Sequence, residues 1–213
     1  SQDSLNLANS NSDLNIDNES TEKNFSIFTT PSKDSSYLAG QTPLKSQYTT
    51  ENIGLAAFNN GKLVGELNAI ETMCYLIIAN KLEIAQISIP NPFYPNETMD
   101  ITIKANKSTK CTVDLVNGTP YININIDILS RLMSMDVGSN TLNKERVKKV
   151  EEYTNKYLEE NILSYLYKTS KDFKTDINGF GRFAVKNFLI WNDWIDYNWL
   201  HKYESATFNV TVK

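Results

Sequence analysis

Residues 121–128, YININIDI, constrain the fold more than any other stretch of the chain. Isoleucine stands at every second position from Ile122 to Ile128, and the residues between are polar. Successive side chains of a β-strand point to opposite faces, so a period of two predicts a strand with one buried and one solvent-facing side. Sheets with one solvated face are commonly antiparallel. The stretch therefore predicts a mainly antiparallel sheet that is covered on one face.

Other segments carry strand signals of the same kind. Residues 53–58 and 62–67 flank Asn59-Asn60-Gly61, whose residues tolerate positive φ, and so predict a hairpin. Asn117-Gly118 predicts a second tight turn, leading into the isoleucine-rich strand. Further strands are expected over residues 84–89, 99–105, 111–116 and 206–212, the last with Ala206, Phe208, Val210 and Val212 facing inward.

Two longer segments have helical periodicity. Residues 68–82 carry apolar side chains at helical spacing, and Asn68, three residues before Glu71, is a plausible cap. After a break at 138–140, a long helix is expected over 143–170, with its charged side chains solvated and close enough to pair. Its predicted inner stripe is Val147, Val150, Tyr157, Leu158, Ile162, Tyr165 and Leu166. The order of elements predicts an α+β fold with the long helix and shorter helices packed on one face of the sheet.

The stretch 175–200, TDINGFGRFAVKNFLIWNDWIDYNWL, holds all three tryptophans. So many large rings could mark a ligand-stacking site, a membrane-facing surface or a core. The apolar side chains recur at three- and four-residue steps, which predicts one ring-bearing helical face packed on the sheet. Gly179 and Gly181 would allow a tight turn and a close approach of the backbone to its neighbours. The aligned residues are Phe180, Phe183, Ala184 and Phe188, then Trp191, Trp194, Ile195 and Asn198.

No catalytic, metal or cofactor site is predicted. The single histidine, His201, has no nucleophile signature near it, so we exclude it as a catalytic base. Asp172 and Asp176 are interleaved with lysines, and Asp176 is better placed to cap a following helix than to hold a cation. Cys74 and Cys111 are too far apart for a zinc motif and fall in apolar patterns, which indicates buried thiols.

Charge and composition set the remaining limits. The net charge of −4 and the pI near 5.1 argue against a nucleic-acid partner. The sequence contains no run of eighteen apolar residues, so no segment is expected to span a bilayer. Residues 1–50 are rich in Ser, Asn, Asp and Thr, which predicts a linker or extended lead-in before a domain over 51–213. The N-terminus has neither an initiating Met nor a signal peptide, so we expect a fragment or a mature form.

Two motifs together resemble a known family. Residues 54–72, GLAAFNNGKLVGELNAIET, and residues 176–181, DINGFG, followed by spaced tryptophans, are similar to the C-terminal domain of the C subunits of GerA-type spore germinant receptors. The resemblance covers about residues 52–213. The residues that carry it here are Gly54, Phe58, Gly65, Glu71, Thr72, Asp176, Gly179, Phe180, Gly181, Trp191 and Trp194.

This resemblance implies a non-catalytic lipoprotein subunit of a nutrient germinant receptor. The full-length protein would lie on the outer face of the spore inner membrane, held by an upstream lipid anchor absent from this fragment. Its expected partners are the A-type and B-type membrane subunits, with which it would dock during germination. The alternative is a domain that binds the germinant directly, with Tyr197, Trp199 and Tyr203 lining a pocket.

Overall fold

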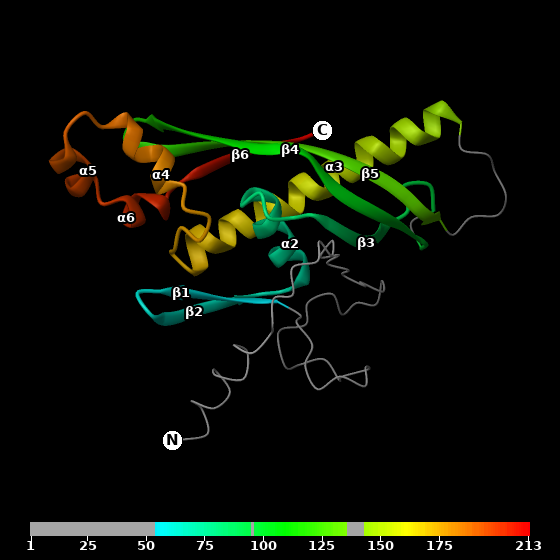
Figure 1. The fold of residues 1–213 in the computed structure, drawn as a ribbon, viewed down its shortest axis with the longest axis horizontal. Helices are drawn as coiled ribbons and strands as arrows, with labels where there is room; N and C mark the ends of the chain where they lie inside the picture. The colour runs from blue at the N-terminus through cyan, green and yellow to red at the C-terminus, as the bar shows by residue number, and fades with distance from the viewer. Residues whose placement is uncertain (1–53, 95, 136–142) are drawn as a thin grey trace, which may run out of the picture.

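The computed structural model describes residues 54–94, 96–135 and 143–213. The expected lead-in over 1–50, the domain boundary at 51 and the break at 138–140 lie outside these residues. In Figure 1 a four-stranded sheet forms the upper layer, helices α2 and α3 lie beneath it, and a separate hairpin lies below the helices. The mixed composition of helices and strands confirms the predicted α+β class.

The main sheet has the strand order β3-β4-β5-β6. Its antiparallel part consists of β3 (Ile84–Pro90), β4 (Thr98–Val116) and β5 (Thr119–Met135). The alternating isoleucines of β5 face the core as predicted, because Ile122, Ile124 and Ile126 are all at most 2% exposed.

One expectation about the sheet was wrong, and one pairing was left open by the sequence. The segments 99–105 and 111–116 are parts of one strand, β4, because its partner β5 is continuous and the pairing passes through irregularities between Ala105 and Lys110. The last strand, β6 (Thr207–Val212), pairs with β5 in parallel, so the sheet is mainly and not wholly antiparallel. Helices separate β5 from β6 along the chain, so β6 can enter the sheet in the same direction as β5. Phe208, Val210 and Val212 of β6 face inward, as predicted.

Local chemistry accounts for the N-terminal elements. Strands β1 (Leu55–Asn59) and β2 (Lys62–Leu67) form the predicted hairpin, with positive φ at Asn60 and Gly61. Helix α2 (Ala69–Ile78) begins with a capping box in which Asn68 and Glu71 bond to each other's backbone N–H groups. It ends before the expected residue 82, and Asn80 then has a positive φ of 59°.

The long helix, α3 (Lys144–Tyr167), continues into a π-helical turn, η1 (Lys168–Asp172). Its predicted inner stripe is buried at Leu158, Ile162, Tyr165 and Leu166. Val147, predicted to belong to the same stripe, is instead 50% exposed, because it lies in the first turn of the helix, where the core does not cover it.

Short helices at one end of the molecule complete the fold (Figure 1). They are α4 (Gly181–Ala184), the 3-10 turn η2 (Val185–Asn187), α5 (Trp191–Tyr197) and α6 (Trp199–Tyr203). The prediction of one ring-bearing face was wrong in part. Phe180 and Ala184 are buried, but Trp191 and Ile195 are 65% and 58% exposed. The segment breaks into separate short turns, so residues at helical spacing along the sequence do not share one face.

Candidate functional site

The DINGFG motif is organised around the Asp176 carboxylate. Its Oδ1 accepts from the backbone N–H of Phe180 at 2.8 Å, and its Oδ2 accepts from the N–H of Gly181 at 2.7 Å. These donors lie at the start of α4, where backbone N–H groups have no partner within the helix. The indole Nε1 of Trp199 also donates to Oδ2, at 2.9 Å. Asp176 therefore fastens a helix start to the aromatic segment, in line with the capping role expected for it.

Neighbouring motif residues complete this arrangement. The hydroxyl of buried Tyr165 donates to Asn178 Oδ1 at 2.7 Å, which connects the motif to α3. Gly179 has a φ of +71°, a backbone conformation that glycine adopts without steric cost. A Cβ on Gly181 would lie 2.9 Å from the indole nitrogen of Trp199. The sequence pattern did not single out Asn178 or Tyr165, because a hydrogen bond between distant segments leaves no local signature.

The residues proposed to line a germinant pocket lie in or against the core. Trp199 is 8% exposed and Tyr203 is fully buried, and their ring centroids are 5.8 Å apart. The Tyr203 hydroxyl lies 2.9 Å from Thr169 Oγ1, and burial raises the pKa of this phenol. Tyr197 is more accessible, and its hydroxyl donates to the backbone oxygen of Gly118. Trp199 contacts Tyr203 directly and Tyr197 only through the ring of Trp194, so these three rings do not line one shared cavity.

The N-terminal motif, residues 54–72, lies in the β1–β2 hairpin and the start of α2. Glu71 receives the Lys168 ammonium at 2.8 Å on both carboxylate oxygens, which ties α2 to the end of α3. A Cβ on Gly65 would overlap the ring of Phe173, so this position allows close packing of β2. Thr72 is buried in α2, Gly54 opens the hairpin and Phe58 is 59% exposed on it. The motif thus combines packing positions with one exposed ring.

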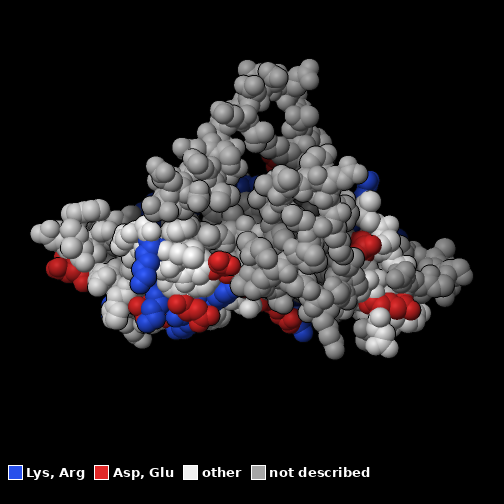
Figure 2. All heavy atoms as spheres, turned by 90° about the horizontal axis from the view of Figure 1, so that it is seen from below, with Lys and Arg blue, Asp and Glu red and all other residues white. Residues whose placement is uncertain are grey.

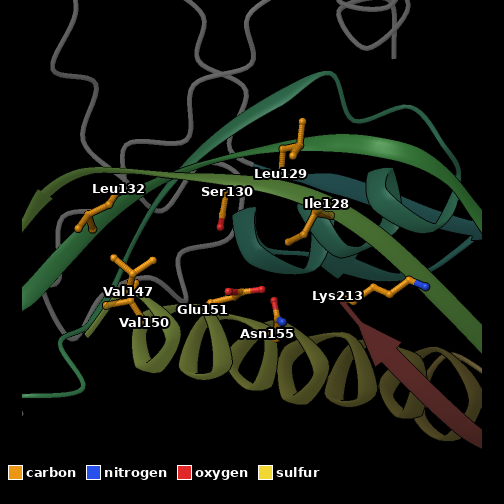
Figure 3. A pocket seen from close by; sticks show the side chains of 9 residues that line it. All are labelled: Ile128, Leu129, Ser130, Leu132, Val147, Val150, Glu151, Asn155 and Lys213. Atoms are coloured by element: carbon orange, nitrogen blue, oxygen red, sulfur yellow. The ribbon is translucent and has the colours of Figure 1, made fainter. Parts of the chain in front are cut away.

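A groove opens between β5 and the first half of α3 (Figure 3). It has a volume of about 300 Å³ and is lined by Ile128, Leu129, Ser130, Leu132, Val147, Val150, Glu151, Asn155 and Lys213. Leu129 and Val147 are 57% and 50% exposed. Figure 3 shows Glu151 and Asn155 reaching from α3 toward the strand. Sequence reasoning missed this groove, since strand and helix meet there only in three dimensions.

Four exposed apolar residues form a second surface, which we call the apolar tip: Leu189, Ile190, Trp191 and Ile195. Leu189 is fully exposed, at 102% of its reference area, and Ile190 is 59% exposed. The tip lies at the end of the molecule that carries α5 (Figure 1). Three of these residues are consecutive in sequence and Ile195 lies one helical turn beyond Trp191, and exposed apolar groups of this kind commonly mark an interaction site.

The described residues contain no arrangement typical of a reaction centre. No group of three or more His, Cys, Asp or Glu side chains in them could hold a metal ion. The His201 side chain is 75% exposed, and its nearest acidic partner, Glu204, is 4.0 Å away. Both cysteines are free thiols, and burial raises the pKa of each, to about 11 for Cys111, so neither is a ready nucleophile near neutral pH.

Surface charges are mixed in sign. Figure 2 shows Lys and Arg side chains interspersed with Asp and Glu on the face it presents, and the described part of that face has no single-sign field. Nucleic-acid binding requires clustered positive charge, which the described part of this face does not offer. Within the described residues, no helix combines the length and the apolar character needed to cross a bilayer.

The geometry describes an α+β domain whose recognisable features are packing motifs and exposed apolar surfaces. The family described as "Spore germination B3/ GerAC like, C-terminal" matches residues 53–213, and the chain belongs to this family. The resemblance to the C-terminal domain of germinant receptor C subunits is thereby confirmed.

One solved structure supports the fold assignment. The crystal structure of the GerBC protein is similar with a TM-score of 0.57 and 18% sequence identity. The match covers 75% of this chain and 49% of that one, so the chain spans about half the length of GerBC. No curated protein matches the chain significantly.

Proposed function

We propose that this domain acts in spore germination as a non-catalytic part of a germinant receptor, by docking with the receptor's membrane subunits. Membership of the spore germination family supports the process. The proposed partners are the A-type and B-type membrane proteins. The proposed location is the outer face of the spore inner membrane, with the full-length protein held there by a lipid anchor.

The observation that carries the docking proposal is the groove between β5 and α3. Its walls are mainly aliphatic, and Val147 remains 50% exposed while Ile128 and Val150 are partly exposed beside it. A partner segment that covered them would remove apolar surface from water, the main favourable term in protein association. Glu151 and Lys213 at the same groove provide opposite charges that could fix the orientation of the partner.

Substitution in the groove tests this proposal. We expect Val147→Gln to fold normally and to lose at least about 90% of its capture by detergent-solubilised A-type and B-type subunits, because buried interface side chains dominate affinity. Leu63→Gln is a matched control, since Leu63 is 49% exposed on the hairpin, away from the groove. Near-UV circular dichroism checks the fold of each variant. Full capture of the groove variant would refute docking at this groove.

Direct germinant binding is the competing function, and the same protein distinguishes it. Calorimetric titration with a germinant amino acid or sugar at millimolar concentration would give saturable heat if Tyr197, Trp199 and Tyr203 formed a binding site. The burial of Trp199 and Tyr203 does not favour this outcome. We therefore expect no saturable heat, whereas a saturable signal that is lost in Tyr197→Ala would replace docking as the primary function.

A further inference from the structure

We propose that the apolar tip inserts into the interfacial region of a lipid bilayer. This role goes beyond docking with receptor subunits, because it requires only a lipid surface. The tip consists of Leu189, Ile190, Trp191 and Ile195, and each of them is more than half exposed. Neither the Asp176 arrangement nor the groove uses these side chains.

The first argument is the shape of the tip. The Leu189 side chain lies entirely in solvent. Residues 187–192, NFLIWN, contain no charged side chain, so the stretch that carries most of the tip is uncharged. A protruding group of aliphatic side chains can enter the acyl region of a bilayer, while the core of a protein interface is usually closely packed against a complementary surface.

The second argument is the placement of the tryptophan. Trp191 opens α5, and Ile195 follows four residues later, so the two side chains lie on one face of the helix. Asp193 is two residues from each of them, about half a turn around the helix. Tryptophan is enriched where proteins meet the headgroup region, because its ring is apolar and its N–H is polar. Asp196 directly follows Ile195, about a quarter turn around the helix, so the Trp–Ile face itself carries no carboxylate but is bordered by one.

The third argument is the charge around the tip. Residues 181–203 contain three basic and two acidic side chains, in a chain whose net charge is −4. Two of the basic side chains, Arg182 and Lys186, lie over the ring of Phe183, and Lys202 lies over the ring of Tyr197. This part of the chain is therefore less acidic than the whole, and its cations can contact anionic headgroups.

The base of the tip is held firmly. Phe188 packs against Trp194 and Tyr197, with ring centroids 5.5 Å and 5.0 Å apart. Trp194 in turn stacks on Trp199, whose indole donates to Asp176. The rings anchor α5 to the core, so insertion of the tip needs little ordering of the chain, and ordering side chains on binding is costly.

Vesicle binding by the 213-residue chain tests the proposal. The probes are vesicles of phosphatidylcholine alone and of equal parts phosphatidylcholine and phosphatidylglycerol. We expect co-sedimentation with both, tighter with the anionic vesicles, and a blue shift of tryptophan emission. The triple variant Leu189→Ser, Ile190→Ser, Ile195→Ser keeps Trp191 as a reporter and should bind at least about tenfold more weakly.

Two controls separate the tip from the rest of the surface. The double variant Leu63→Ser, Met133→Ser removes apolar side chains that are 49% and 57% exposed elsewhere, and it should bind like the parent chain. Brominated lipids should quench the parent chain, and this quenching should fall strongly in Trp191→Phe while binding persists. Near-UV circular dichroism confirms that the variants fold.

Three outcomes would overturn the proposal. The parent chain could bind neither vesicle, the triple variant could bind as well as the parent, or quenching could survive in Trp191→Phe. If the parent chain does not bind vesicles but the triple variant loses capture by receptor subunits in detergent, the tip contacts protein and not lipid. The groove variant described above keeps the tip intact, so its failure to dock is a separate result.

Discussion

Single residues in this domain have roles that depend on backbone shape as much as on side-chain chemistry. Gly179 has a φ of +71°, and the Asp176 carboxylate contacts the N–H groups that follow it. The sequence predicted that a glycine here would serve a tight turn, and it predicted a cap at Asp176. It did not predict the bond from the Trp199 indole, because that donor lies 23 residues further along the chain.

Replacement of Gly179 tests the backbone requirement. We expect Gly179→Ala to lower the free energy of unfolding by about 1 kcal/mol, since a Cβ disfavours positive φ. Urea denaturation followed by circular dichroism measures the change. Asparagine tolerates this conformation better than alanine, so Gly179→Asn should be less destabilising. Equal stability of the Gly179→Ala variant and the parent chain would show that the turn does not require glycine.

At the scale of elements, local signals were reliable and long-range ones were not. The hairpin turns and the α2 cap follow from a few adjacent residues, such as Asn60-Gly61 and Asn68 with Glu71. The continuity of β4 and the parallel entry of β6 depend on β5, which is remote in sequence. The prediction that Trp191 shares a buried face with Phe180 was wrong. The periodicity gave no sign that α4 ends at Ala184 and that Trp191 begins a separate helix, α5.

The contact between α2 and the end of α3 gives a prediction at this scale. Glu71→Ala removes both the reciprocal capping bond to Asn68 and the partner of Lys168, whose ammonium is only partly exposed. We expect a loss of about 2 kcal/mol in the free energy of unfolding, because a partly buried ammonium loses its carboxylate partner and keeps only the Glu66 backbone oxygen. Thermal denaturation measures it.

A matched acidic residue on the same helix layer provides the control. Glu160 pairs with Lys156 on the exposed side of α3, at 3.7 Å, and its side chain is 64% exposed. Glu160→Ala should change stability by less than about 0.5 kcal/mol. Similar losses in the Glu160→Ala and Glu71→Ala variants would indicate a general charge effect and would contradict a specific role for Glu71.

At the scale of the whole molecule, one core joins elements from both ends of the described chain. The buried cluster includes Leu67 from the hairpin, Ile124 from β5, Leu158 from α3 and Phe208 from β6. This unity could be anticipated from alternating and helical apolar patterns. The groove and the apolar tip could not, because they are defined by side chains that the core leaves uncovered.

Removal of β6 tests how far the core depends on its last strand. Deletion of residues 207–213 should abolish the near-UV circular dichroism signal and make the chain sensitive to protease, since Phe208 packs edge-on against Tyr167 and Tyr203. The control Thr207→Ser, Thr211→Ser alters only the exposed side of the same strand. A truncated chain that kept its native spectrum would contradict the proposed dependence.

The parallel pairing of β5 with β6 also has a consequence for biosynthesis. Ribosomes deliver the chain from its N-terminus, and domains tend to fold as units once their sequence has emerged. Because β6 is the last of these elements to be translated, the edge of β5 opposite β4 has no strand partner while α3 and the short helices leave the exit tunnel. Nascent polypeptides of this domain should therefore need protection from self-association until translation has passed Val212.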